Sequence, residues 1–235
     1  MLQVKIFTIF PDAFPGVLGF SICGRALEQK KWNLKTINIK DFAKDKHKTV
    51  DDTPFGGGAG MLMKADVLSD AIESELKAET SSPIIILTSA RGSRFNQKIA
   101  SKLSSINKTI YIICGRFEGV DQRFIDFYQI NEVNLGNFVL FGGEVAAMAM
   151  LEAIIRLIPD ILGNSETTKE ESYAVGTEFE NLMEYPQYTK PKTWNNLEVP
   201  EILFSGHHKN IAKWRMEEAK KITKKSLNLK FLDEG

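Results

Sequence analysis

Apolar runs alternate with helical patterns along the first two thirds of the chain. The runs that predict strands are rich in β-branched residues, and they cover positions 4–10, 34–39, 83–87, 109–113 and 128–135. Helical periodicity fills the segments between them, at positions 22–31, 64–77, 95–103 and 143–158, with a short helix after Gly119. Continuous β-branched runs suit central strands that are covered on both faces. The pattern therefore predicts an α/β fold built on a parallel sheet.

The pattern changes after residue 162. Positions 163–184 lose hydrophobic periodicity and carry six glutamates against a single lysine. Helical periodicity returns in the last part of the chain. We therefore expect three parts: an α/β domain over residues 1–162, an acidic flexible linker over 163–184, and a small helical domain over 185–235.

Composition narrows the class of protein. Hydrophobic residues make up 43% of the 235 positions, so a substantial core is possible. The 30 basic and 30 acidic side chains exclude a strongly cationic polyanion binder, but a local basic patch can still bind phosphates. The two cysteines and three histidines show no zinc-ligand spacing. Neither a signal peptide nor an apolar stretch of about 20 residues is found, so we expect a soluble cytoplasmic protein.

Glycine is concentrated where three of the predicted strands end. These exits lie at positions 89–92, 114–119 and 135–144. Ligands of open α/β sheets bind beyond the carboxyl ends of the strands, and glycine lets the backbone approach them closely. Three such exits in succession predict a slot lined by main chain, suited to an adenine ring and its ribose, although glycines can also serve only as turns and caps. No GxGxxG follows the first strand and no P-loop occurs, which disfavours an ordinary Rossmann or P-loop enzyme.

A fourth glycine cluster is the most distinctive segment of the chain. It spans positions 47–61 and contains three consecutive glycines, Gly56–Gly58. Such a flexible loop is costly unless something must approach its backbone. Asp51 and Asp52 lie in the same loop beside basic residues, where their carboxylates can hold the loop or meet a substrate.

Several of these segments together carry a resemblance to a known family. They read HxTVDDxPxGGGxGM from His47, CGRxEGxDxR from Cys114, GxxVLxGGE from Gly136, YPQYTKP from Tyr185 and SGHH from Ser205. In this order they resemble the TrmD family, the bacterial tRNA (guanine-N1)-methyltransferases of the SPOUT class. The resemblance covers positions 10–215.

The resemblance implies properties that spacing alone does not give. It implies a deep trefoil knot in the methyl-donor domain, a rare exception to the rule that chains do not thread loops. It also implies a homodimer with its active site between subunits, S-adenosylmethionine as methyl donor, and a need for magnesium. The implied reaction is methylation of N1 of the guanine immediately 3′ of the tRNA anticodon.

The resemblance also assigns roles to individual residues. Arg156 stands at the position of the family's catalytic arginine, and Glu171 stands where the family has an aspartate as general base. Asp51 is a third catalytic candidate, and no metal ligand is assigned. The implied donor-binding residues are Leu87, Gly115, Phe117, Glu118, Gly119, Leu135, Gly136, Asn137, Phe138, Val139, Leu140, Gly142 and Gly143. The implied tRNA-binding residues are Gly57, Gly58, Ser172, His207, Lys213 and Arg215.

These roles lead to a mechanistic hypothesis. Glu171 removes the proton from guanine N1, with Glu170 as the alternative base, and Arg156 stabilises charge that develops on the base. The chain departs from the family at Glu171, at Asn137 for aspartate, at Phe138 for tyrosine, at Phe141 for serine and at Ala146 for proline. Two other readings remain: a knotted methyltransferase for another RNA, and a non-catalytic protein that binds RNA or senses the donor.

Overall fold

The computed structural model describes residues 1–163 and 165–225. The chain forms two compact units, residues 1–163 and residues 164–235, and each is described by itself. Residue 164 of the predicted linker and residues 226–235 of the predicted helical domain lie outside the described residues.

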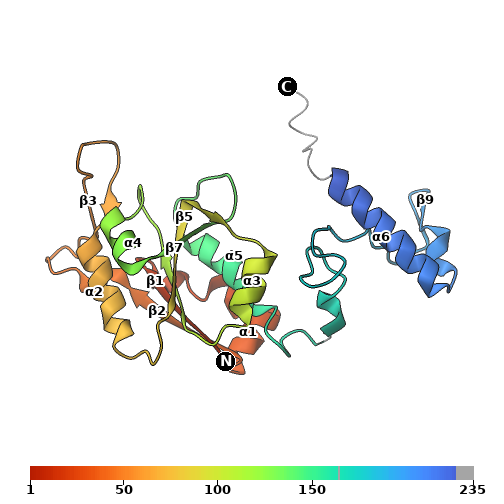
Figure 1. The fold of residues 1–235 in the computed structure, drawn as a ribbon, viewed down its shortest axis with the longest axis horizontal. Coiled ribbons are helices and arrows are strands. Elements are labelled where there is room, and N and C mark those ends of the chain that lie inside the picture. The colour runs from red at the N-terminus through yellow and green to blue at the C-terminus, as the bar shows by residue number, and fades with distance from the viewer. Residues whose placement is uncertain (164, 226–235) are drawn as a thin grey trace. The chain divides into compact units, whose positions relative to one another are not determined.

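A five-stranded parallel sheet forms the centre of the N-terminal unit (Figure 1). Its strand order is β2-β1-β6-β5-β7, and every neighbouring pair runs parallel. The strands are β1 (Leu2–Thr8), β2 (Trp32–Asn38), β5 (Ile84–Arg94), β6 (Ile110–Cys114) and β7 (Asn131–Asn134). The sequence prediction of a parallel α/β sheet is confirmed.

Helices cover both faces of this sheet, so the unit has three layers (Figure 1). In β6, Ile110 and Ile112 pack into the core shared with α1, α3 and α5, whereas Tyr111 and Ile113 pack toward α2 and α4. This alternation explains the continuous apolar run, because both faces of a central strand are buried. The helices are α1 (Ser21–Glu28), α2 (Ala65–Leu76), α3 (Gln97–Ser104), α4 (Gln122–Tyr128) and α5 (Glu144–Ile155). Shorter elements are the 3₁₀ turns η1 (Pro11–Ala13), η2 (Gly16–Gly19) and η3 (Ile39–Phe42) and the paired strands β3 (Asp51–Asp52) and β4 (Leu62–Met63).

Most element boundaries shift by a few residues from the sequence prediction, and two of the differences lie near the ends of strands that form the site. The segment predicted to be extended from Tyr128 starts only at Asn131, because Tyr128 closes α4 and its hydroxyl lies 2.7 Å from that of Ser69. The strand predicted to end at residue 87 continues as β5 to Arg94. The register between β5 and β7 shifts between Thr88 and Ser93, so residues 89–92 leave the regular ladder.

The C-terminal unit is small and has its own core. Ala174, Phe179, Tyr185 and Ala219 are buried together. Ala174 and Phe179 belong to the segment predicted as an acidic linker, so part of that segment packs in this unit, and the division into linker and helical domain stays a prediction. The unit contains η4 (Ser165–Thr168), β8 (Thr193–Trp194), β9 (Leu197–Glu198), η5 (Glu201–Phe204) and α6 (His208–Lys225).

A tight hairpin in this unit went unpredicted. It joins β8 to β9 through Asn195 and Asn196, which have φ values of 49° and 60°. Asparagine tolerates this left-handed backbone better than most residues, and two such residues form a favoured hairpin turn. In the described parts of the chain, no helix has both the length and the apolar character that crossing a membrane requires.

Candidate methyl-donor site

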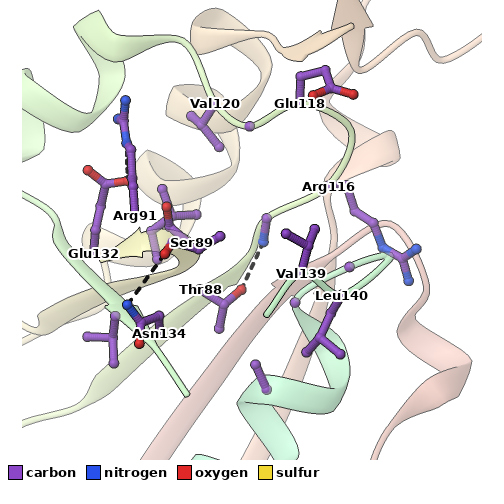
Figure 2. Close-up of a pocket in the computed structure, with 18 of the residues that line it drawn as sticks. Thr88, Ser89, Arg91, Arg116, Glu118, Val120, Glu132, Asn134, Val139 and Leu140 are labelled. Atoms are coloured by element: carbon purple, nitrogen blue, oxygen red, sulfur yellow. Dashed lines mark hydrogen bonds and ion pairs between the residues drawn. The ribbon is translucent and has the colours of Figure 1, made fainter. Parts of the chain in front are cut away.

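A cavity of about 540 Å³ lies beyond the carboxyl ends of β5, β6 and β7 (Figure 2). All of the residues predicted to bind the methyl donor line it, except Asn137. The strand exits predicted from glycine therefore meet in one place, as expected for an open parallel sheet. Ser89, Ala90 and Arg91, from the part of β5 that leaves the regular ladder, complete one wall.

Thr88 joins the backbone segments that form the floor of the cavity. Its hydroxyl donates to the carbonyl oxygen of Ile113 at 3.2 Å and accepts from the backbone N–H of Gly115 at 3.0 Å (Figure 2). The N–H of Gly143 in turn donates to the carbonyl of Gly115 at 2.9 Å. The end of β5, the end of β6 and the start of α5 are thus held together by main-chain and hydroxyl hydrogen bonds.

Two glycines in this region are required by close packing. A Cβ at position 143 would overlap the hydroxyl of Thr88 and lie 2.8 Å from the nitrogen of Gly115. A Cβ at position 142 would overlap the guanidinium of Arg116. The backbone at these positions packs against neighbours that leave no space for a side chain, which is a structural reason for the consecutive glycines of the GxxVLxGGE segment.

Arg116 and Glu144 form an ion pair behind the cavity. The Nη2 atom of Arg116 lies 2.7 Å from Oε2 of Glu144, whose side chain is almost completely buried. The hydroxyl of Thr8 donates to Oε1 of Glu144 at 2.7 Å. The guanidinium also lies over the ring of Phe10, 4.5 Å from its centre, and donates to the carbonyl of Phe141 at 3.3 Å.

Polar groups line the opposite wall, where β5 faces β7. Arg91 Nε lies 2.8 Å from Oε1 of Glu132, and this contact raises the pKa of Arg91 (Figure 2). The amide nitrogen of Asn134 donates to the carbonyls of Ala90 and Gly92. Its Oδ1 atom is buried and has no hydrogen-bond partner in the described part of the chain.

Apolar side chains surround the entrance. Phe117, Phe138, Val139, Leu140 and Phe141 are all exposed although they are large and hydrophobic. Val139 and Leu140 project beside the cavity in Figure 2. An apolar rim of this kind on a polar surface marks a binding region for a ligand or a partner.

Cys114 shows that a reactive thiol is not part of this arrangement. It is fully buried at the end of β6, and burial raises the pKa of its thiol well above the ordinary value. A thiol in such a setting stays protonated and is a poor nucleophile. Cys114 is therefore a small buried residue of the core.

The three predicted catalytic residues lie on different elements. Arg156 follows directly after α5 in the N-terminal unit. Asp51 is in β3, where it is half-buried and paired with Met63. Glu171 is half-buried in the C-terminal unit. Their catalytic roles stay predictions.

The predicted tRNA-binding residues are also dispersed. Gly57 and Gly58 lie exposed in the loop before β4 with φ values of 79° and 131°. The hydroxyl of Ser172 accepts from the N–H of Glu184 at 2.8 Å. His207 precedes α6, and its carbonyl accepts hydrogen bonds from the first turn.

The two cationic candidates on α6 have different surroundings. Lys213 is largely exposed, with Glu217 4.0 Å away. Arg215 Nη1 lies 3.0 Å from Oε2 of Glu170, and its guanidinium lies over the ring of Tyr185. The Tyr185 hydroxyl donates to the same carboxylate oxygen at 2.8 Å. Burial and the contact with Glu170 raise the pKa of Tyr185 to about 12, so this hydroxyl remains a donor.

Sequence reasoning missed the residues that hold the cavity together. Thr8, Thr88, Arg116 and Glu144 received no role, although Arg116 and Glu144 lie within the two motifs quoted from this region. The only local signal was a polar residue directly at the end of a predicted apolar strand, which applies to Thr88 but not to Thr8, because Thr8 lies inside the predicted strand 4–10. Among the residues that the structure describes, no group of three or more His, Cys, Asp or Glu side chains is placed to hold a metal ion.

Comparison with known families agrees with this geometry. The family model described as tRNA (Guanine-1)-methyltransferase TrmD matches residues 2–229. The chain belongs to the TrmD family. Its SPOUT fold class accords with the parallel sheet and with the ligand cavity at the strand ends.

Individual TrmD-family relatives are similar over nearly their whole length. A tRNA (guanine-N(1)-)-methyltransferase from Wolbachia pipientis wMel is 50% identical over 223 residues, covering 95% of this chain and 92% of the relative. The protein of that name from Ehrlichia canis (strain Jake) is 48% identical, with the same coverage. That from Ruegeria sp. (strain TM1040) is 48% identical and covers 94% of this chain and 88% of the relative.

Proposed function

We propose that this chain methylates N1 of the guanine immediately 3′ of the anticodon in tRNA, with S-adenosylmethionine as methyl donor. Membership of the TrmD family supports the methyltransferase activity and the tRNA substrate. The observation that carries the proposal is the cavity at the ends of β5, β6 and β7, which unites the donor-binding residues inferred from sequence.

The cavity has the chemical character that such a donor requires. The backbone is bare of side chains at three lining positions, Gly115, Gly142 and Gly143. It therefore gives a close-fitting surface for a flat ring. Leu87 and Leu140 offer apolar contacts. When bound, S-adenosylmethionine supplies a methyl group on a positively charged sulfur, which is already a strong electrophile.

The chemical difficulty then lies in guanine, whose N1 carries a proton at neutral pH. In our proposal Glu171 accepts this proton as general base. The N1–CH₃ bond forms as the S–CH₃ bond breaks, and the electron pair of that bond returns to sulfur. Arg156 stabilises the negative charge that develops on the base, at O6. The target guanine leaves its stack to reach the site.

Glu170, the alternative base, is held by two contacts within the C-terminal unit. The Glu170 carboxylate accepts a hydrogen bond from Tyr185 and forms an ion pair with Arg215. The same contacts anchor the chain next to Glu171, which fits a role for Glu170 in placing its neighbour.

The remaining inferences from the family belong to the same proposal. We propose a homodimer, which the exposed apolar side chains at the cavity entrance support because a second subunit would cover them. We also propose the deep trefoil knot, action in the cytoplasm, and tRNA contacts from Lys213 and other basic residues of α6. Magnesium stays an expectation from the family with no ligand set assigned.

One assay tests the proposed function. Purified protein is incubated with labelled S-adenosylmethionine, magnesium and two tRNA transcripts that differ only in having guanine or adenine 3′ of the anticodon. We expect label only in the guanine transcript, at N1 by nucleoside mass spectrometry. In a parallel incubation with ribosomal RNA, label there but in neither tRNA transcript would instead indicate a methyltransferase for another RNA. Donor binding without any transfer would indicate a non-catalytic protein.

A further inference from the structure

The buried carboxylate of Glu144 connects parts of the chain that are far apart in sequence. Glu144 is the first residue of α5 and is 4% exposed. One of its oxygens accepts from Thr8 at the end of β1, and the other lies 2.7 Å from Nη2 of Arg116, which follows β6. Thr8 itself is fully buried. Three sheet-end segments therefore converge on one carboxylate.

Arg116 transmits this connection to the cavity. Its guanidinium donates to the carbonyl of Phe141 and packs against the backbone of Gly142, where a side chain would overlap it. Arg116, Phe141 and Gly142 all line the cavity, whereas Glu144 does not. Glu144 thus contacts the wall only through residues that form it.

Burial of Glu144 makes its ion pair with Arg116 sensitive to small displacements of the backbone. A carboxylate removed from water carries a large desolvation cost, which is offset only when it is paired. Glu144 is 4% exposed, whereas its partner Arg116 is partly exposed at the cavity wall. Here the pairing requires the segment after β6 and the segment before α5 to keep their observed arrangement. Any displacement of the 141–143 backbone would disturb Arg116 and expose the pair to that cost. The ion pair therefore favours one conformation of the cavity wall before any ligand arrives.

We infer that Glu144 is a positioning residue for methyl-donor binding, acting through Arg116 to hold the wall formed by residues 141–143. The inference rests on the proposed function for the identity of the ligand. It assigns Glu144 to donor affinity and leaves proton removal from guanine to other residues.

A purely structural role for Glu144 makes a different prediction. A glutamate in the first turn of a helix interacts favourably with the helix dipole. If that were its whole contribution, a neutral replacement would lower thermal stability and leave donor affinity unchanged. Donor affinity and the split between KM and kcat therefore separate the two roles.

The test compares Glu144→Gln with Asp70→Asn in the full-length protein. Asp70 forms an exposed ion pair with Lys44, 2.9 Å away, on α2, so its variant removes one carboxylate charge outside the cavity. We measure the Kd for S-adenosylmethionine by calorimetry and the donor KM and kcat with tRNA. For Glu144→Gln we expect Kd and donor KM to rise about tenfold, as for loss of a charged hydrogen bond, with kcat within about twofold of wild type. Asp70→Asn should match wild type.

Two further variants keep the inference testable if Glu144→Gln fails to fold. Thr8→Val removes only the hydroxyl donor to Glu144, and Arg116→Lys keeps the charge but loses the planar fork that reaches both Glu144 and Phe141. Both should raise the donor Kd, and Arg116→Lys should do so more strongly. In a double-mutant cycle, the effect of Arg116→Lys should shrink in the Glu144→Gln background.

The outcomes separate this inference from the proposed function. Wild-type protein that neither binds the donor nor transfers a methyl group would refute the proposed function. Active wild-type protein whose donor Kd is unchanged in the Glu144, Thr8 and Arg116 variants would overturn the positioning role. A fall in kcat at unchanged Kd would also overturn it, since it would place these residues in the chemical step.

Discussion

The hydroxyl of Thr88 lies where a side chain at position 143 would have to be placed. The two residues are far apart in sequence, yet both bond to Gly115, Thr88 through its hydroxyl and Gly143 through its N–H. The Thr88 hydroxyl packs directly against the backbone of Gly143, so neither group can move aside for an added side chain. This relationship gives a direct test of the cavity floor.

Gly143→Ala should therefore weaken donor binding. The added methyl group would push apart Thr88 and Gly115, and overpacking of this kind costs about 1–3 kcal/mol, so the donor Kd should rise by about tenfold or more. Calorimetric titration with S-adenosylmethionine measures the change. Gly163→Ala is the matched control, because a Cβ there meets no atom within 4 Å. Unaltered donor binding in Gly143→Ala would show that the donor does not use this floor.

Neutralising the two neighbouring glutamates should give unequal results. Glu171→Gln should lower the single-turnover rate by about 100- to 10,000-fold, as expected for loss of a general base. Glu171→Asp restores the family's residue and should stay active. Glu170→Gln should have a smaller effect on rate, because Glu170 is already bonded to Tyr185 and Arg215. A severe loss in Glu170→Gln with normal turnover in Glu171→Gln would reassign the base to Glu170.

Salt dependence of tRNA binding should distinguish Lys213 from Arg215. Lys213 is exposed and only loosely paired, so Lys213→Ala should lower the slope of log affinity against log salt by about 1, as for one lost phosphate contact. Arg215 is held by Glu170 and Tyr185, so Arg215→Ala should change the slope less and destabilise the C-terminal unit. Filter binding at several salt concentrations measures both slopes. Equal slopes for wild type and Lys213→Ala would remove Lys213 from the tRNA interface.

A charge cluster between the sheet and α2 should make stability sensitive to acid. Lys5 of β1 lies 2.9 Å from Glu75 and 2.7 Å from Glu79, and all three side chains are largely buried. Burial raises the pKa of both carboxyls, but hydrogen bonds to their charged forms outweigh this effect. Glu75 accepts from Lys35 and Lys5. Glu79 accepts from Lys5, Thr109 and Tyr111. Both pKa values therefore lie below the ordinary 4.5.

The direction in which stability changes with pH follows from the lowered pKa values of Glu75 and Glu79. A carboxyl whose pKa is lower in the folded state contributes stability that is present above its ordinary pKa and is lost as the pH falls through the folded value. The thermal midpoint should thus drop as the pH is lowered below about 4.5. Lys5→Met should reduce the midpoint at neutral pH and flatten this acid dependence. Lys44→Met is the control, because it removes the exposed ion pair with Asp70 and should leave the pH dependence of the thermal midpoint unchanged. If wild type and Lys5→Met lose thermal stability equally as the pH falls, the coupling of Lys5 to Glu75 and Glu79 is refuted.

The sequence predicted the sheet well because strand signals are local. Apolar runs such as 84–86 and 110–113 need only their own residues to indicate burial on both faces, and the glycine-rich exits followed from the geometry of parallel sheets. The contacts of Glu144 were beyond such reasoning, because Thr8 lies 136 positions away. Similarly, the acidic composition of residues 163–184 indicated a linker, whereas burial of Ala174 and Phe179 depends on Tyr185 and on Ala219 of α6.

The irregular segment of β5 has a consequence for how this cavity can diversify. Strand β7 pairs with β5 on both sides of residues 89–92, so those residues are an excursion whose length does not set the register of the sheet. A change in the length or side chains of residues 89–92 would therefore alter this one wall and leave the pairing of β5 with β7 on either side in place. Inhibitors that distinguish enzymes differing in this segment should accordingly find their discriminating contacts at Ser89–Arg91, and their common contacts at the closely packed backbone of Gly142 and Gly143.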